Sequence, residues 1–209
     1  MKILNLFLVT ILISCQLDAL EQEFFLELDM SWNFSLEDKM NVYTYNEDDS
    51  FLSGLGGGFG YRASFDFNVL KLGPSLSYHQ KSEDLVRNTG ASQDKFSAKF
   101  ESSRLGLFLK LDLWQGIALY SEYHPVVSSK VKKLNSGSHS PLQIGDSISG
   151  TSSGYGFYMY WQNNVAVTAI YRKTIYKDMN LSGVKTSLPN QQYNRPSLDE
   201  FVVQMSYWF

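Results

Sequence analysis

The chain has 209 residues, which after removal of any leader is enough for one ordinary domain. Hydrophobic residues make up 44% of it, aromatic residues 15% and charged residues 19%, and the mean hydropathy is -0.21, so neither a disordered chain nor a bundle of membrane helices fits. Eighteen lysines and arginines oppose twenty-one acidic residues, for a net charge of -3. No basic cluster is long enough to follow a phosphate backbone, which excludes nucleic acid as an expected partner.

The N-terminus has the features of a signal peptide. The apolar run Ile3–Ile13 has the length of a signal-peptide core and is too short to cross a bilayer. A cut after Ala19 gives a mature chain without cysteine, which suits an oxidising periplasm. Alternatively, the stretch that ends in Cys15 resembles a bacterial lipoprotein box, with Cys15 lipidated. We expect residues 1–19 to be a signal peptide and residues 20–209 to form one domain.

Downstream of the leader, apolar residues recur at every second position. In the segment 24–37 the even positions are apolar and the odd positions from Glu27 onward are polar. A strand sorts such residues onto two faces, whereas a helix would scatter them. About a dozen residues is also the length that a tilted strand needs to cross a bilayer. Seven further segments show this alternation: 55–67, 70–79, 104–113, 117–124, 154–161, 165–172 and 201–209.

The connections between these segments alternate in length. Two or three residues follow the second, fourth and sixth segments, whereas roughly 15 to 30 mostly polar residues follow the first, third, fifth and seventh, as in outer-membrane barrels. We therefore predict an all-β, eight-stranded antiparallel transmembrane barrel with short periplasmic turns and both termini on the periplasmic side. The four long extracellular loops are expected at residues 37–54, 80–95, 125–152 and 174–199.

Aromatic residues fall where the two membrane interfaces of such a barrel would lie. One set is expected beside the short turns and the chain end, and the other at the opposite strand ends. The first set is Phe67, Trp114, Trp161, Tyr207 and Phe209, and the second is Tyr78, Tyr123, Tyr155 and Tyr171.

Two segments resemble a known family. The chain end, with Val203, Met205, Tyr207 and a terminal Phe209, resembles the insertion signal of bacterial outer-membrane barrels. The segment Leu72–Tyr78 is similar to strands of small eight-stranded barrels of the opacity-protein and outer-membrane-protein-A-like superfamily. The resemblance covers roughly residues 23 to 209. It implies an outer-membrane location and, as partners, outer-membrane lipid, lipopolysaccharide and the barrel-assembly machinery. Members of this superfamily include anchors, adhesins, small-solute pores and lipid-modifying enzymes.

The polar faces of the strands point into the barrel, whose interior is just wide enough for side chains to fill. They carry charges of both signs, which we expect to pair as a lumen charge network, because a buried carboxylate without a partner is driven to protonate. Asp66 should lie directly opposite Lys71 across its tight turn. The predicted network is Glu27, Asp29, Arg62, Asp66, Lys71, Arg104, Lys110, Asp112, Glu122 and Arg172.

Neither a nucleotide loop nor a metal or cofactor site is expected. The five glycines between Gly54 and Gly60 do not fit the G-x-G-x-x-G spacing, so we interpret them as permitting bends and close packing of aromatic side chains. No two histidines have a metal-site spacing, and the acidic stretch Glu47–Asp49 lacks the glycine and terminal glutamate of a calcium loop.

Catalysis is not expected either. None of the three histidines has the His-x-Ser arrangement of the barrel lipid A deacylases. His124 and Glu122 both face inward and are placed to polarise Tyr120 or a loop serine, but no nucleophile is defined.

The sequence therefore predicts a monomer with a structural role, or with surface ligands bound through its loops, and with a lumen closed by its charges. Bulky inward Phe108, Tyr120, Tyr158 and Tyr160 should help to close it. The alternative is a small-solute channel lined by the same charged groups. The third hypothesis is that the protein is a lipid-modifying enzyme.

Overall fold

The computed structural model describes residues 20–32, 34–38, 43–47, 54–88, 93–114, 116–136, 142–161 and 164–209. The predicted signal peptide and Cys15 lie outside these ranges. Eight strands form the barrel: β1 (Leu20–Trp32), β4 (Gly54–Asp66), β5 (Leu70–Asn88), β6 (Gln93–Trp114), β7 (Ile117–Ser136), β8 (Ser147–Tyr160), β9 (Val165–Leu181) and β11 (Ser197–Trp208). Three short strands lie beside them: β2 (Ser35–Asp38), β3 (Tyr43–Glu47) and β10 (Val184–Ser187).

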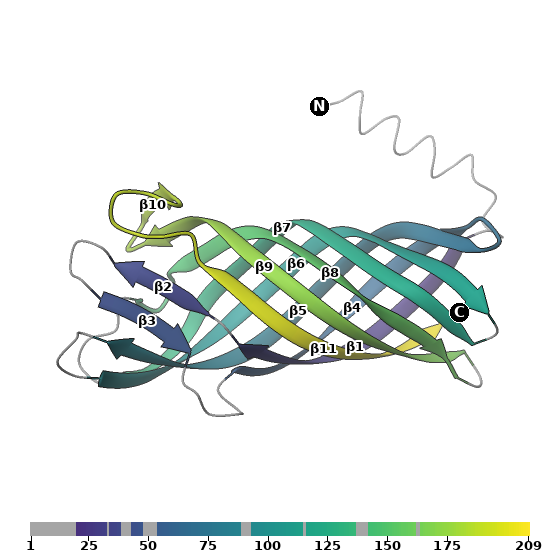
Figure 1. Ribbon diagram of the computed structural model, residues 1–209, viewed down its shortest axis with the longest axis horizontal. Helices are drawn as coiled ribbons and strands as arrows, with labels where there is room; N and C mark the ends of the chain where they lie inside the picture. The colour runs from purple at the N-terminus through teal and green to yellow at the C-terminus, as the bar shows by residue number, and fades with distance from the viewer. Residues whose placement is uncertain are drawn as a thin grey trace, which may run out of the picture.

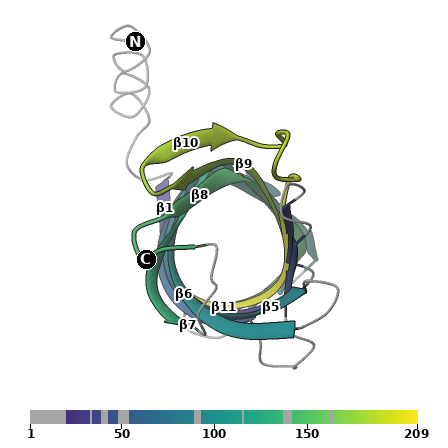
Figure 2. The same ribbon diagram turned by 90° about the vertical axis from the view of Figure 1, so that its left-hand side faces the viewer.

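The eight strands close into a ring in which every pairing is antiparallel. β1 pairs with both β4 and β11, and the β5–β6 pairing completes the circle. The view along the barrel shows this ring, with β10 outside it beside β9 (Figure 2). The predicted eight-stranded antiparallel barrel is confirmed. In the described ranges no helix is long and apolar enough to span a bilayer.

The tight turns and the chain end lie together at one end of the barrel. Asn68, Gly116 and Asn164 adopt φ values of 73°, 91° and 63°, the left-handed conformation that short turns require. At the same end the backbone amide of Phe209 donates to the carbonyl of Gln22 over 3.0 Å. β2, β3 and β10 lie at the opposite end (Figure 1).

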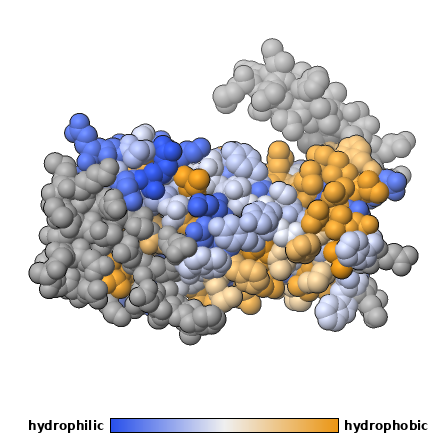
Figure 3. Space-filling view, viewed as in Figure 1, coloured by the Kyte–Doolittle hydropathy of each residue, from blue (hydrophilic) through white to orange (hydrophobic). Residues whose placement is uncertain are grey.

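A belt of exposed apolar side chains surrounds the half of the barrel that carries the tight turns. Hydrophobic residues dominate this half in the space-filling view, and hydrophilic residues become frequent toward β10 (Figure 3). Such a belt is the surface that a barrel presents to lipid. The side chains of the predicted insertion signal belong to it: Val203, Met205, Tyr207 and Phe209 are exposed. Their role in insertion remains a prediction.

The predicted bounds of the long connections are wrong. Most of the residues assigned to loops 80–95, 125–152 and 174–199 belong to strands, and residues 35–38 and 43–47 form a hairpin that pairs with β5. Tyr78, Tyr123, Tyr155 and Tyr171 therefore lie within strands and not at their ends. The strands continue because their backbones still bond to one another above the membrane, where outward side chains no longer need to be apolar.

Above these tyrosines the outward face becomes polar, and further up the inward face becomes apolar. On β6, Lys99 and Glu101 point outward while Phe100 between them is buried. The inward residues of this extracellular extension form an upper apolar cluster, to which the connecting segments also contribute. The cluster consists of Phe34, Leu85, Ala98, Phe100, Val131, Leu142, Ile148, Tyr176, Met179, Leu188, Tyr193 and Leu198. The extension is thus a water-exposed barrel with its own apolar core.

Candidate functional site

The lumen inside the apolar belt is the candidate functional site, and it begins with a layer of aromatic and cationic groups. Arg62 is fully buried, donates to Glu23 over 2.8 Å and also bonds Gln204. Its guanidinium lies 4.1 Å from the ring centre of Phe25 and 4.8 Å from that of Tyr120. These cation–π contacts offset part of the cost of burying the charge.

A second cation shares the carboxylate of Glu23. The ammonium of Lys110 lies 3.0 Å from Glu23 and 4.3 Å from the ring centre of Tyr158. Around these cations lies a lower apolar cluster: Phe108, Ala118, Tyr120, Tyr158, Ala166, Ile170 and Val202. Each of the three predicted closing residues Phe108, Tyr120 and Tyr158 is at most 3% exposed, and Tyr160 packs against the cluster.

Glu27 lies at the centre of the charged groups above this layer. Its carboxylate is 3.3 Å from Arg104 and 3.4 Å from Arg172, and it accepts a hydrogen bond from Gln204 over 3.1 Å. Arg172 in turn lies 2.5 Å from Glu122. The structure therefore brings four predicted residues, Glu27, Arg104, Glu122 and Arg172, into one connected, fully buried set.

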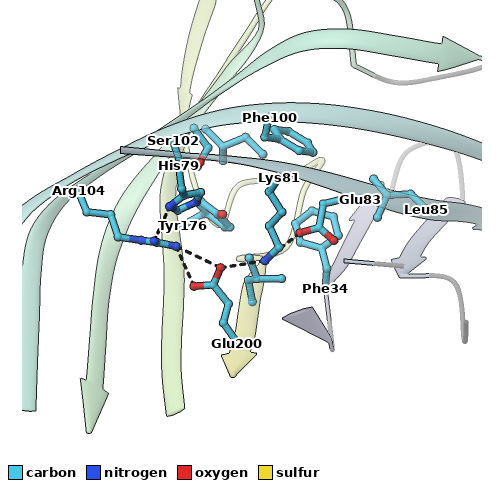
Figure 4. A pocket seen from close by; sticks show the side chains of 13 residues that line it. Phe34, His79, Lys81, Glu83, Leu85, Phe100, Ser102, Arg104, Tyr176 and Glu200 are labelled. Atoms are coloured by element: carbon cyan, nitrogen blue, oxygen red, sulfur yellow. Dashed lines mark hydrogen bonds and ion pairs between the residues drawn. The ribbon is translucent and has the colours of Figure 1, made fainter. Parts of the chain in front are cut away.

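The upper part of the network contains residues that the sequence analysis did not include. Nη2 of Arg104 donates to both carboxylate oxygens of Glu200, over 2.8 and 3.1 Å. Lys81 lies 2.8 Å from Glu200, 3.1 Å from Glu83 and 3.7 Å from the predicted Asp29. Figure 4 shows Lys81 and Arg104 reaching Glu200 from two sides.

These partners were missed because the predicted strands were too short. Lys81 and Glu83 fall within the segment assigned to a loop, and Glu200 precedes the last predicted strand by one residue. Glu23 lies at the start of β1, ahead of the segment whose alternation was analysed. Continuing the inward positions of each strand two steps further would have included all four.

Three predicted residues lie outside this buried set, at the tight-turn end. Asp66 pairs with Lys71 in the β4–β5 register, and their charged atoms are 3.4 Å apart, as expected from the turn. The shorter contact of Lys71 is to Glu21, at 2.5 Å. Asp112 accepts a hydrogen bond from Tyr160 over 2.9 Å. These groups are partly exposed and form the rim of the lumen.

A small cavity separates the charged groups from the upper apolar cluster. Its volume is about 20 Å³, enough for roughly one water molecule. His79, Lys81, Glu83, Arg104 and Glu200 line one side (Figure 4). Apolar side chains from the upper cluster, including Phe34, Leu85 and Phe100, line the other.

One trio of side chains has the composition of a metal site, but two cationic side chains lie against it. Ligand atoms of Glu27, Asp29 and His79 lie within 4.8 Å of one another. Arg104 lies 2.6 Å from Nδ1 of His79, and Lys81 lies 3.7 Å from Asp29. Two cations at these distances occupy the space and the charge that a metal ion would need.

The groups considered for catalysis are likewise enclosed. Tyr120 donates its hydroxyl proton to Glu122 over 2.9 Å, and Nδ1 of His124 lies 3.3 Å from the hydroxyl of Ser152. All four side chains are 3% exposed or less. A substrate would have to enter the charged interior to reach them.

Solved structures of small outer-membrane barrels have the same fold. The chain is similar to the outer membrane protein OprG from Pseudomonas aeruginosa (13% identity, 91% of this chain and 96% of that chain, TM-score 0.52). It is also similar to Neisserial surface protein A (14% identity, 91% and 97%, TM-score 0.50) and to Ail from Yersinia pestis (16% identity, 91% and 99%, TM-score 0.46). No protein-family model and no curated protein matches it.

At these identities the likeness concerns the fold. The closed antiparallel ring, the apolar belt and the polar interior together define a β-barrel of the bacterial outer membrane.

Proposed function

We propose that this protein is a closed, non-conducting outer-membrane barrel that acts through its extracellular extension and not by passing solutes. The observation that carries the proposal is the buried group of charges around Glu27, Arg104 and Arg172, which lies between the lower and upper apolar clusters. An eight-stranded barrel leaves little space beyond its own side chains. A path for ions would have to cross all three layers.

The contacts within the network support a closed lumen. Arg62 bonds groups of β1 and β11, and Arg104 reaches from β6 to Glu27 on β1 and to Glu200 on β11. Arg104 therefore crosses the interior, whereas Arg62 bonds the next two strands of the ring, β1 and β11, and reaches β7 only through the aromatic ring of Tyr120. Ion pairs that span a barrel in this way hold opposite walls together and fill its cross-section.

Conductance of the purified protein in a planar bilayer tests the proposal. The unmodified protein should show little steady current at physiological salt. Arg62→Gln and Arg104→Gln should each leave a buried carboxylate with one partner fewer and produce brief conducting states, because charge matching closes the lumen. Lys185→Gln, on the exposed strand β10, is the control and should behave like the unmodified protein.

Stable, solute-selective conductance from the unmodified protein would overturn the proposal. The same inward residues would then be the lining of a small-solute channel.

A further inference from the structure

One nitrogen of His79 lies between a hydrogen-bond donor and a hydrogen-bond acceptor. Its Nδ1 is 2.6 Å from Nη1 of Arg104 and 3.3 Å from Oε1 of Glu27, and those two atoms are 3.3 Å apart (Figure 4 shows the contact with Arg104). A guanidinium can only donate, and an ionised carboxylate can only accept. The protonation state of Nδ1 therefore decides which of its two neighbours it bonds.

The arrangement in the structure requires a neutral imidazole. At 2.6 Å, Arg104 donates to Nδ1, which must then carry no proton. The side chain of His79 is 1% exposed, so bulk water hardly screens the imidazole from the guanidinium. A proton on Nδ1 would place two donors face to face and displace Arg104, and Nδ1 would then donate a charge-assisted hydrogen bond to Glu27.

Charged and titratable side chains of both kinds surround His79. Those that face it are Glu27 and Asp29 of β1, Lys81 and Glu83 of β5, Arg104 of β6, Tyr176 of β9 and Glu200 of β11. On β4 its neighbour in register is Gly58, which has no group to titrate. An oxygen of Asp29 lies within 4.8 Å of His79, and neither oxygen of that carboxylate has a hydrogen-bond partner among the described residues. Asp29 therefore favours a positive charge on the imidazole.

The buried charges of the lumen are one positive charge short when the histidines are neutral. Ion pairs and hydrogen bonds connect these charges into one set of side chains, each at most 5% exposed. Among the described residues the set consists of the carboxylates Glu23, Glu27, Asp29, Glu83, Glu122 and Glu200 and the cations Arg62, Lys81, Arg104, Lys110 and Arg172. A proton on His79 would balance this set, whereas the contact with Arg104 opposes that proton.

We propose that His79 is a proton-operated switch of the lumen, an inference that rests on the proposed closed barrel. At neutral pH its imidazole accepts from Arg104 and helps to hold that arginine across the interior. In acid the protonated Nδ1 donates to Glu27, and Arg104 loses this partner, which loosens the layer that closes the barrel. The adjacent cavity has room for about one water molecule, which can carry the proton to the imidazole.

Nitrogen NMR of the imidazole tests the switch without any measurement of conductance. The chain has three histidines, so His124→Gln/His139→Gln leaves His79 as the only source of signal in tag-free, histidine-labelled protein. In lipid nanodiscs at about pH 7.5, Nε2 should carry a proton and Nδ1 should carry none, and Nδ1 should gain one on acidification to about pH 4.5. An imidazole already charged at the higher pH, or one still neutral at the lower pH, would overturn the proposal.

Planar-bilayer recordings test the consequence for the lumen. Openings of the unmodified protein should be at least about tenfold more frequent at about pH 5 than at about pH 7.5, since the ratio of protonated to neutral imidazole rises about tenfold per pH unit. His79→Gln cannot take up the proton and should open equally rarely at both pH values. The matched control is His124→Gln, which replaces the other buried histidine, whose Nδ1 lies 3.3 Å from the hydroxyl of Ser152. It should respond to pH like the unmodified protein.

The two experiments separate this inference from the proposed function. Steady conductance of the unmodified protein at neutral pH would refute the closed barrel, and the NMR titration would still decide whether His79 changes its partner. Openings that do not depend on pH, or a pH response that survives in His79→Gln or disappears in His124→Gln, would overturn the switch. Heat-dependent mobility on a gel shows that each variant is folded, and the NMR titration needs no change at His79.

Discussion

Arg172 shows how the lumen tolerates full charges out of contact with water. Its guanidinium joins Glu122 at 2.5 Å and Glu27 at 3.4 Å, and all three side chains are 3% exposed or less. Burying each of these charges alone would cost several kcal/mol, about the same order as the stability of a whole domain. The arginine and its carboxylates are therefore stable only as a group.

Replacing Arg172 with methionine should destabilise the barrel by about 3–5 kcal/mol, because it leaves Glu122 buried without its main partner. The free energy of unfolding, measured by urea titration in lipid vesicles, checks this. Adding Glu122→Gln to the same chain should recover part of the loss, since the unpaired charge is then removed. If the double variant were less stable than the single one, the cost would come from lost packing and not from the unpaired charge.

Glycine on β4 shows how one strand makes room for the side chains of its neighbours. A Cβ added at Gly60 would lie 2.1 Å from Cζ of Phe25 and 2.6 Å from the carbonyl oxygen of Leu76. The ring of Phe25 makes the cation–π contact with Arg62. The sequence analysis interpreted these glycines as permitting close packing of aromatic side chains, and at Gly60 the contact is with an aromatic ring of the adjacent strand.

Gly60→Ala should destabilise the barrel by about 1–3 kcal/mol, because Phe25 must move and the packing over Arg62 is disturbed. Gly57→Ala is the matched control on the same strand. Its added Cβ would lie 3.4 Å from the nearest atom, which is ordinary contact. Urea unfolding of the two variants side by side measures the difference, and equal stability would show that the crowding at Gly60 relaxes without cost.

At the scale of the whole molecule, the barrel has no free edge in its ring. All eight strands bond to two neighbours, and the largest inward side chains fill the ring. Opening such a barrel requires many backbone hydrogen bonds to break together. This closure also explains how the extension holds its shape above the membrane with a small apolar core of its own.

Unboiled protein in detergent should therefore migrate differently from boiled protein on a gel. The compact barrel survives the detergent at room temperature and opens only on heating. A time course of heating, followed by band position, measures the change. Identical mobility before and after boiling, or recovery of the protein from the soluble periplasmic fraction, would contradict the closed membrane barrel.

The sequence by itself determined the features that local patterning encodes. A period of two specifies strands and separates the lipid face from the interior, so that Leu26 and Glu27 could be assigned to opposite faces. The contact between Asp66 and Lys71 was also predictable, because a tight turn fixes the register of its two strands. The strand ends were not predictable from the same pattern. Above Tyr155 the outward residues become polar, so a search for apolar outward residues stops there while the strand continues.

Only the tertiary structure decided which charges meet. Arg104 and Glu200 are 96 positions apart and lie on strands that do not pair, and Lys81 reaches the same carboxylate from β5. These contacts depend on the closure of the ring and on the stagger of all eight strands. Neither can be predicted from the sequence of a single strand. Alternation along a strand is set by local backbone geometry, whereas contacts across a lumen or around a wall are set by how the whole barrel closes.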